Sequence, residues 1–394
     1  MAEGGTSRTR RMTATLREVD TVTPLELFFD LVFVLAITQC TQLMADEPTW
    51  EGIAKGLLVL AVLWWSWIGY AWLTSVVDPE EGSVRLVIFA AMGGLLVASI
   101  CIPGAFGDSA LIFAIAYAVV RAAHILLFWI ASNDDAGLRR STTGLGISTA
   151  IACGILVGAS FLDGPLQGAA WALAIVLDFG GPFLFGSAGW KLIPEHFAER
   201  HGLIIIIALG ESIVAIGAGV TGEVTLGVVA VAVTGIVLAA TMWWAYFDVV
   251  ALVAGRRLAS ISDQQERNET ARDSYSYLHL PMVAGIVLVA LGMKKTIGHF
   301  DDPLKIETAA ALTGGFSLYL LAHVAFRYRN VRTVSVRRLI LGVGLLALIP
   351  VGVELPALGT LAILTAFACA LIAYETIRYA ESRERVRHEP TEAT

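Results

Sequence analysis

The sequence has little charge for its length. Charged residues make up 15% of the 394 positions, whereas hydrophobic residues make up 56%. Soluble domains contain about 25% charged residues, so this shortage excludes an ordinary water-soluble protein. The apolar runs are long enough for membrane-spanning helices of about 20 residues, and they lack the polar alternation of a membrane β-barrel. The net charge of −7 comes mostly from loops and tails, so no nucleic-acid partner is expected.

Cysteine and the common catalytic motifs are also scarce. The four cysteines have no Cys-x-x-Cys spacing and lie in or at the ends of apolar segments, which favours reduced thiols over a disulfide framework or a zinc site. The sequence contains no Walker loop, no Gly-x-Ser-x-Gly elbow and no His-Glu-x-x-His motif. We therefore assign no catalytic residue, no metal site and no cofactor.

Twelve apolar segments are predicted to form membrane-spanning helices. They cover residues 24–44, 53–77, 84–103, 109–131, 141–161, 166–190, 201–220, 225–250, 276–297, 306–328, 336–355 and 357–379. The last two are separated only by Glu354, Pro356 and small residues. They could therefore form either a tight hairpin or one broken segment. Residues 1–23 hold four arginines but no apolar core, which indicates a cytoplasmic tail and not a cleaved signal peptide.

The distribution of basic residues gives these segments a direction. With the N-terminus in the cytoplasm, Lys55, Lys294, Lys295 and Lys305 are expected outside and Arg121 inside a span. All other basic residues, of 27 Lys and Arg, then fall on the cytoplasmic side. Basic residues concentrate in the cytoplasmic loops of membrane proteins, so both termini are predicted to be cytoplasmic.

The second half of the sequence restates the first. Landmarks recur in the same order: Phe29-Asp30 and Gly210-Glu211, Trp64-Trp65 and Trp243-Trp244, Ala123-His124 and Ala322-His323, Arg139-Arg140 and Arg337-Arg338. We therefore predict an all-α integral membrane protein with two parallel six-helix repeats, 24–190 and 201–379, a cytoplasmic connecting loop over 191–200 and a cytoplasmic tail over 380–394. Chance resemblance among apolar helices is the alternative. Repeated halves are common in transporters, where the substrate path lies at their interface.

Five charged residues of the predicted spans would be costly if they faced lipid: Asp30, Arg121, Asp178, Glu211 and, nearer a span edge, Glu26. Facing lipid without partners, they would cost on the order of 15 kcal/mol together, so they must face the protein interior. Glu26 and Asp30 lie about 40° apart around their helix. Because the repeat equates Asp30 with Glu211, these two acids could approach a shared axis. Either they form a proton or cation site, or each pairs with a buried arginine or a tryptophan N–H and holds helices in register.

Further polar residues extend this network. Arg121 and His124 are three residues apart and share a helix face, and Asp178 is the expected anion for Arg121. His124 and His323 recur at equivalent places, although a lone histidine in a helix is usually structural. Ser212 follows Glu211 in a glycine-containing helix that permits close approach of neighbours.

The predicted connecting loop is rich in ionisable groups. It carries His196, Glu199 and Arg200 at a helical spacing that could bring them together, and His201 follows directly after it. The arginine opposes a bound cation, so a cytoplasmic cap or coupling loop is expected rather than a metal site.

Two sequence motifs resemble a known family. The run T-P-L-E-L-F-F-D-L-V-F-V from Thr23 to Val34, and E-H-F-A-E-R from Glu195 to Arg200 with the later Gly210-Glu211-Ser212, resemble the bacterial low temperature requirement protein A (LtrA) family over residues 20 to 380. The resemblance implies a bacterial inner-membrane location. The family takes its name from a cold-growth phenotype, so the resemblance implies no substrate or reaction.

A shorter resemblance covers Phe29 to Thr38. This segment is similar to the first-helix motif of the lysosomal-type potassium channels, which also contain six-plus-six helices. In those channels the first helix of each repeat lines the pore, with an isoleucine constriction and an aspartate in a structural network. The present chain differs at Phe28-Phe29 and lacks the arginine that precedes the channel motif.

Together these observations predict a transporter or channel for a small ion or solute. Asp30 and Glu211 would be paired intramembrane acids, supported by Arg121, His124, Asp178 and His323. The alternatives are a membrane-embedded enzyme or lipid-related factor acting through His196, Glu199 and His201 at the cytoplasmic face, and a membrane scaffold. The predicted partners are the lipid bilayer and a small ion or proton, and homo-oligomerisation stays open.

Overall fold

The computed structural model describes residues 21–186, 189–220 and 222–388, and these residues contain helices and no β-strand. The helices of the first half are α1 (Pro24–Asp46), α2 (Trp50–Thr74), α3 (Gly82–Cys101), η1 (Ile102–Gly104), α4 (Ala110–Ala131), α5 (Ala136–Ala159) and α6 (Gly164–Phe185). The predicted all-α class is therefore confirmed. Most of the predicted N-terminal tail, with its four arginines, lies outside the described residues.

The second half begins with a helix that starts earlier than predicted. Its helices are α7 (Pro194–Gly219), α8 (Leu226–Phe247), α9 (Val250–Ala259), α10 (Gln264–Thr270), η2 (Ala271–Tyr277), α11 (His279–Gly298), α12 (Ile306–Ala309), η3 (Ala310–Gly314), α13 (Gly315–Val331), α14 (Val336–Leu345), α15 (Leu348–Gly352), α16 (Ala357–Arg378) and α17 (Ala380–His388). The segments α8–α9, α10–η2–α11 and α12–η3–α13 each continue as one long helical stretch.

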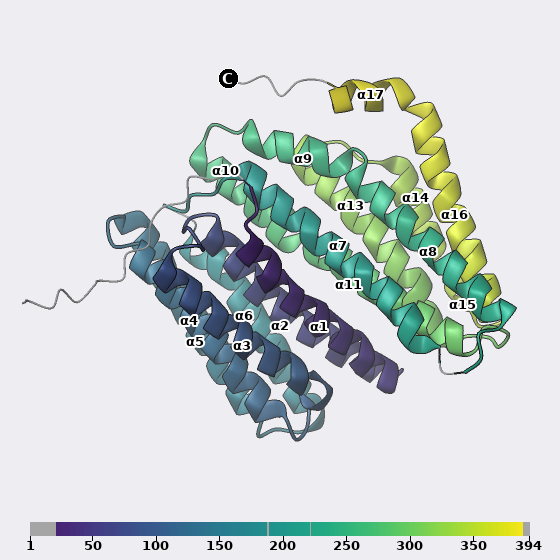
Figure 1. Ribbon diagram of the computed structural model, residues 1–394, viewed down its shortest axis with the longest axis horizontal. Helices are drawn as coiled ribbons and strands as arrows, with labels where there is room; N and C mark the ends of the chain where they lie inside the picture. Colours follow the sequence, from purple (N-terminus) through teal and green to yellow (C-terminus); the bar gives the residue numbers. More distant parts are fainter. Residues whose placement is uncertain (1–20, 187–188, 221, 389–394) are drawn as a thin grey trace, which may run out of the picture.

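Eleven helical stretches in the described part of the chain are long and apolar enough to cross a membrane, not twelve. The predicted continuous helix over 336–355 is wrong, because this segment is split into α14 and α15. Proline cannot donate a backbone hydrogen bond and its ring clashes with the carbonyl four residues earlier. For Pro350 that residue is Leu346, where the break falls. α14 and α15 still follow one another along the bundle (Figure 1).

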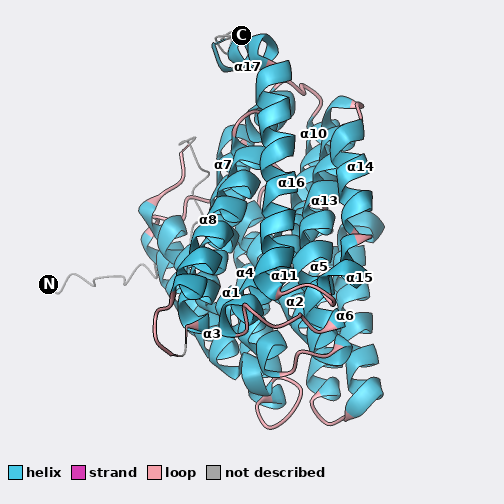
Figure 2. Ribbon diagram, turned by 90° about the vertical axis from the view of Figure 1, so that its right-hand side faces the viewer, coloured by secondary structure: helices cyan, strands magenta, loops and turns pink. Residues whose placement is uncertain are grey.

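The helices form two groups that meet along α1. Figure 1 shows α1 to α6 on one side and α7 to α16 on the other, and α1 packs against both α7 and α11 of the second group. Figure 2, turned by 90°, shows the helices running mostly in one direction with the loops gathered at the two ends. The contact of α1 with α7 therefore lies between the halves and runs the length of the bundle.

Three helices at this contact run in the same direction. Glu26 and Arg200, near the starts of α1 and α7, form an ion pair at 3.0 Å. Further along, Thr38 of α1 donates a hydrogen bond to Glu211 of α7 at 2.5 Å. Lys294, near the end of α11, donates to Gln42 near the end of α1. We refer to the start of α1 as the first end of the bundle and to the end of α1 as the second end.

Candidate functional site

The start of α1 is fixed by its own sequence. Thr23 is the N-cap, Pro24 occupies the first helical position, and Thr23 and Glu26 form a capping box. The Thr23 amide and hydroxyl donate to Glu26 Oε2 at 2.9 and 3.1 Å. One carboxylate oxygen of Glu26 therefore holds the helix start, and the other, Oε1, is left to face α7.

The start of α7 corrects the prediction of a connecting loop over 191–200. α7 begins at Pro194, and proline at the first helical position costs no hydrogen bond. His196, Arg200 and His201 are then buried within the first two turns. Burial of His196 and Arg200 is tolerated because both side chains contact the acids of α1. Glu199 is the exposed exception, and it accepts a hydrogen bond from the Val22 amide at 3.2 Å.

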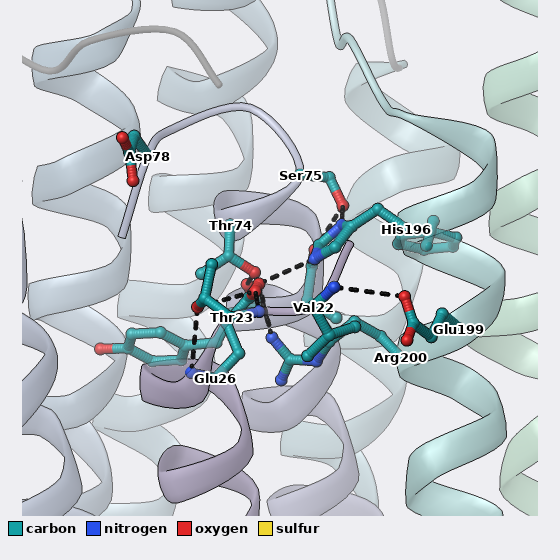
Figure 3. A network of polar contacts seen from close by, with 12 residues as sticks. Val22, Thr23, Glu26, Thr74, Ser75, Asp78, His196, Glu199 and Arg200 are labelled. Atoms are coloured by element: carbon teal, nitrogen blue, oxygen red, sulfur yellow. Dashed lines mark hydrogen bonds and ion pairs between the residues drawn. The ribbon is translucent and has the colours of Figure 1, made fainter. Parts of the chain in front are cut away.

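Arg200 joins both acids of α1. Its Nη1 atom donates to Glu26 Oε1 at 3.0 Å and to Thr74 Oγ1 at 3.1 Å, and its Nη2 atom donates to Asp30 Oδ1 at 2.7 Å. Trp67 Nε1 donates to the same Asp30 oxygen at 2.9 Å. Figure 3 shows the guanidinium between the starts of α1 and α7. A charged network thus ties the two halves together at the first end.

His196 lies between an acid and a hydroxyl. Its Nε2 atom is 2.9 Å from Glu26 Oε1, and its Nδ1 atom is 3.1 Å from Ser75 Oγ at the end of α2 (Figure 3). Ser75 Oγ also donates to the Ala71 carbonyl at 2.8 Å. When the Ser75 hydroxyl donates its hydrogen to the Ala71 carbonyl, its oxygen can only accept from His196. Both ring nitrogens of His196 then face acceptors, Ser75 Oγ and Glu26 Oε1, and the imidazole carries two protons. If the hydroxyl rotates to donate to Nδ1, a neutral imidazole satisfies both contacts. The proton count of His196 is therefore linked to one hydroxyl rotation.

The cluster of Glu26, Asp30, His196 and Arg200 is fully buried, with side chains at most 1% exposed. Two carboxylates and one guanidinium leave one negative charge when the imidazole is neutral and none when it is protonated. Within the described residues, Asp30 Oδ2 and Arg200 Nε have no hydrogen-bond partner. A cavity of about 10 Å³ lies against Glu26 and Arg200, close to the space that one water needs. Uptake of one proton would make this cluster electrically neutral.

Glu211 forms a second polar position on the same contact, and it does not meet Asp30. Its partner is Thr38, eight residues after Asp30 along α1, so the two acids lie about 12 Å apart along the helix. The expectation that they approach a shared axis is wrong for the described structure. The repeat alignment equated the residues in sequence, but packing sets the helix register. Ser212 is buried beside Glu211, and its hydroxyl has no partner among the described residues.

An apolar segment separates the two acidic positions. Phe33 and Ile37 of α1, Ile204 of α7 and Val283 of α11 are buried there around a second cavity of about 10 Å³. The cavity is too small for a hydrated ion. Along α1 the contact is therefore charged at the first end, apolar in the middle and polar again from Thr38 to Gln42.

The predicted pair of Arg121 and Asp178 is present, but away from this contact. Arg121 Nη2 lies 3.0 Å from Asp178 Oδ1, and Thr149 Oγ1 contacts both partners at 2.8 and 2.9 Å. His124 is buried beside Tyr70 and Phe128. One cation and one anion in good geometry satisfy each other, so this group holds α4, α5 and α6 in register.

The remaining predicted histidines lie in aromatic surroundings. His201 Nδ1 bonds the Phe197 carbonyl at 2.8 Å, and its ring centroid is 5.1 Å from that of His279. His323 bonds the Tyr319 carbonyl at 2.8 Å. Neither contacts Glu26 or Asp30, so of the four loop candidates only His196 and Arg200 belong to the charged cluster.

Sequence reasoning missed Trp67, Thr74 and Ser75 as members of the site. A usable signal existed, because Trp67 and Thr74 are seven residues apart and therefore share one face of α2. A second signal links the two motifs. Glu26 and His196 each come two residues after the proline that opens their helix, and Asp30 and Arg200 each come six residues after it. The two acids of α1 and the two basic residues of α7 therefore occupy equivalent positions relative to the start of their helices.

Comparisons with known proteins give a family but no activity. The family described as bacterial low temperature requirement A protein (LtrA) matches residues 21–373. An uncharacterized protein of Rhizobium meliloti (strain 1021) is 32% identical over 315 residues, which cover 75% of this chain and 74% of that protein. No solved structure matches the chain.

Proposed function

We propose that this chain, which belongs to the bacterial low temperature requirement A (LtrA) family, carries a proton or a small cation across the membrane along the contact of α1 with α7. Eleven apolar helices and the family match make it a multi-pass membrane protein. Under this proposal α14 and α15 together form a twelfth, broken crossing, so both termini keep the predicted position on the cytoplasmic side of a bacterial inner membrane. The first end of the bundle is then the cytoplasmic end.

The observation that carries the proposal is the buried cluster of Glu26, Asp30, His196 and Arg200. A buried charge without compensation is expensive, and ionisable groups inside membrane spans commonly serve ion pathways or proton relays. Here an excess negative charge sits beside an imidazole whose proton count can change by one. A proton arriving from the first end would neutralise the cluster, and its loss would restore the charge. This is the behaviour of a proton-binding site in a transporter.

The order of groups along α1 supports a path with a closed middle. A proton or cation leaving Asp30 must pass the apolar segment of Phe33, Ile37 and Ile204 before it reaches Glu211. Hydrophobic constrictions of this kind close membrane pathways until the helices move or water enters. We therefore infer that the described conformation is closed and that transport requires α1 and α7 to separate in the middle.

The packing of the two halves is compatible with the proposed repeat. In the first half α2 packs on α6 and α3 packs on α4, and in the second half α8 packs on α16 and α11 packs on α13. Repeated halves that meet at a polar midplane path are a common transporter design. Under this proposal the contact of α1 with α7 is that meeting point.

Replacing Glu211 with glutamine is expected to reduce proton flux to the level of empty liposomes. Glutamine keeps the size of the side chain and an oxygen that accepts the hydrogen bond from Thr38, but it cannot bind a proton at that oxygen. The measurement uses purified protein in liposomes that contain a pH-sensitive dye, with a potassium gradient and valinomycin as the driving force. Asp302→Asn, at an exposed acid on a loop, is the matched control and should leave the flux unchanged. If Glu211→Gln protein shows the same flux as wild type, the proton path does not run through this contact.

A second candidate function, a membrane-embedded hydrolase, rests on one contact chain. Ser75, His196 and Glu26 follow one another in the order of nucleophile, base and orienting acid. Against it, Ser75 is 2% exposed and its hydroxyl is bonded to a backbone carbonyl. Labelling of the native protein at Ser75 by a fluorophosphonate, with no proton flux, would favour the hydrolase over the transporter.

A further inference from the structure

A large cavity lies in the second half, away from the charged cluster. It has a volume of about 410 Å³ and opens among the end of α8, the start of α9, the end of α13, the start of α14 and α17. This volume falls within the range of small-molecule sites, about 300 to 1,000 Å³. Neither the proposed transport path nor the family match accounts for it.

Two buried acceptor atoms line this cavity without a partner among the described residues. His323 is 1% exposed, and the bond from its Nδ1–H to the Tyr319 carbonyl leaves Nε2 as an acceptor in the neutral ring. Asn330 is 6% exposed, and its amide nitrogen donates to the Phe326 carbonyl while its Oδ1 atom stays unpaired. Buried polar atoms are rarely left unsatisfied, so a hydrogen-bond donor is expected opposite them.

The charged lining of the cavity has an excess of cations. Four arginines and two acids line it: Arg327, Arg337, Arg338, Arg383, Asp248 and Glu375. Arg338 is paired with Glu375, and Arg383 is paired with Asp248. Arg327 and Arg337 are exposed and donate hydrogen bonds to the hydroxyls of Thr333 and Tyr379 at 2.9 and 2.6 Å. Arg337 also lies over the ring of Tyr374, 4.6 Å from its centroid. Among the described residues, no ion pair with a carboxylate is seen for either arginine. Two positive charges therefore stay available for an anion.

The other walls are apolar and lie at one end of the bundle. Val250, Val253 and Val331 line the cavity together with Trp244. Trp244 is 40% exposed, and tryptophan at the end of a spanning helix marks the headgroup level of the bilayer. α17 contributes a wall and is held by the ion pairs of Arg383 and Arg387 with Asp248.

We propose that this cavity binds a phosphate ester whose alcohol part carries a free hydroxyl group. The phosphate would accept hydrogen bonds from Arg327 and Arg337, and the hydroxyl would donate to Asn330 Oδ1 or His323 Nε2. The same chemistry occurs in the headgroup of phosphatidylglycerol and in soluble glycerol phosphate. The ligand would connect α13 and α14 with α17 at the first end of the bundle.

Binding is tested with the full chain in detergent micelles by native mass spectrometry. The probes are phosphatidylglycerol, phosphatidylcholine of the same acyl length, and glycerol 3-phosphate. Retention of one phosphatidylglycerol per chain, with phosphatidylcholine lost, assigns the site to a lipid headgroup, and retention of glycerol phosphate alone assigns it to a soluble ester. The proposal is overturned if neither phosphatidylglycerol nor glycerol 3-phosphate is retained to a greater extent than phosphatidylcholine.

The matched variants are Arg327→Gln with Arg337→Gln and, as the control, Arg332→Gln. Arg332 is exposed in the same α13–α14 connection but does not line the cavity. Losing charge-assisted hydrogen bonds should weaken binding of the retained ester at least about tenfold in the double variant, with Arg332→Gln close to wild type. All three residues are exposed, so folding should be unaffected, and thermal unfolding checks this. Equal weakening by Arg332→Gln would show nonspecific attraction to basic residues and overturn the site.

Discussion

Replacing Arg200 with glutamine is expected to lower the free energy of unfolding by about 3 to 5 kcal/mol, the usual effect of removing one partner of a buried ion pair. Arg200 is fully buried and bonds Glu26, Asp30 and Thr74. Without its charge the two carboxylates would face each other across the contact of α1 with α7, and His196 alone would compensate them. The two halves of the bundle should then separate more easily at the first end.

Thermal unfolding in detergent, followed by SDS titration, measures this loss. Arg257→Gln is the control, because Arg257 makes a half-exposed pair with Glu266 that should contribute little. The double variant Arg200→Gln with Asp30→Asn should recover part of the lost stability, since it removes one of the uncompensated acids. An Arg200→Gln protein as stable as wild type would mean that water reaches the cluster and that its charges are not buried.

Replacing His196 with glutamine should separate transport from stability. The glutamine amide can donate to Glu26 and its oxygen can accept from Ser75, so both contacts of the imidazole have a replacement. The amide cannot take up a proton. Because a positioned proton-transfer group typically contributes about 100-fold or more to a rate, we expect the proton flux to fall by about that factor, with the stability within about 1 kcal/mol of wild type.

The same liposome assay measures the His196→Gln flux. His299→Gln is the control, because His299 is 74% exposed on a loop and its pairing with Asp302 lies outside the cluster. A flux that survives His196→Gln while the protein stays folded would assign His196 to structure alone. Loss of folding would instead identify the histidine as part of the packing between α1, α2 and α7.

Sequence patterns predicted elements better than they predicted contacts. The spans could be found because apolar length dictates them, and Arg121 could be matched to Asp178 because a deeply buried cation needs an anion. The helical start of α7 was missed, since His196, Glu199 and Arg200 read as polar loop residues when α1 is ignored. Their burial depends on Glu26 and Asp30, which are 170 or more residues earlier.

Helix register was the other feature that sequence similarity did not reveal. The repeat landmarks equate Asp30 with Glu211, whereas packing places Asp30 against Arg200 and Thr38 against Glu211. Landmark spacing constrains which helices correspond, but the depth at which two helices meet is set by side-chain packing and ion pairing. The prolines that open α1 and α7 give the observed register more closely, because Glu26 and His196 follow them by equal intervals.

Transport is proposed to take a proton or a small cation across the membrane between α1 and α7. The most direct measurement is the proton flux of wild-type protein in dye-loaded liposomes, compared with Asp30→Asn protein reconstituted at the same density. Asparagine keeps an oxygen that can accept from Arg200 and Trp67 but removes the negative charge and the unpaired Oδ2 atom. We expect the flux of wild-type protein to exceed that of empty liposomes and to be lost in Asp30→Asn. Equal flux in wild-type and Asp30→Asn liposomes would rule out a path through Asp30.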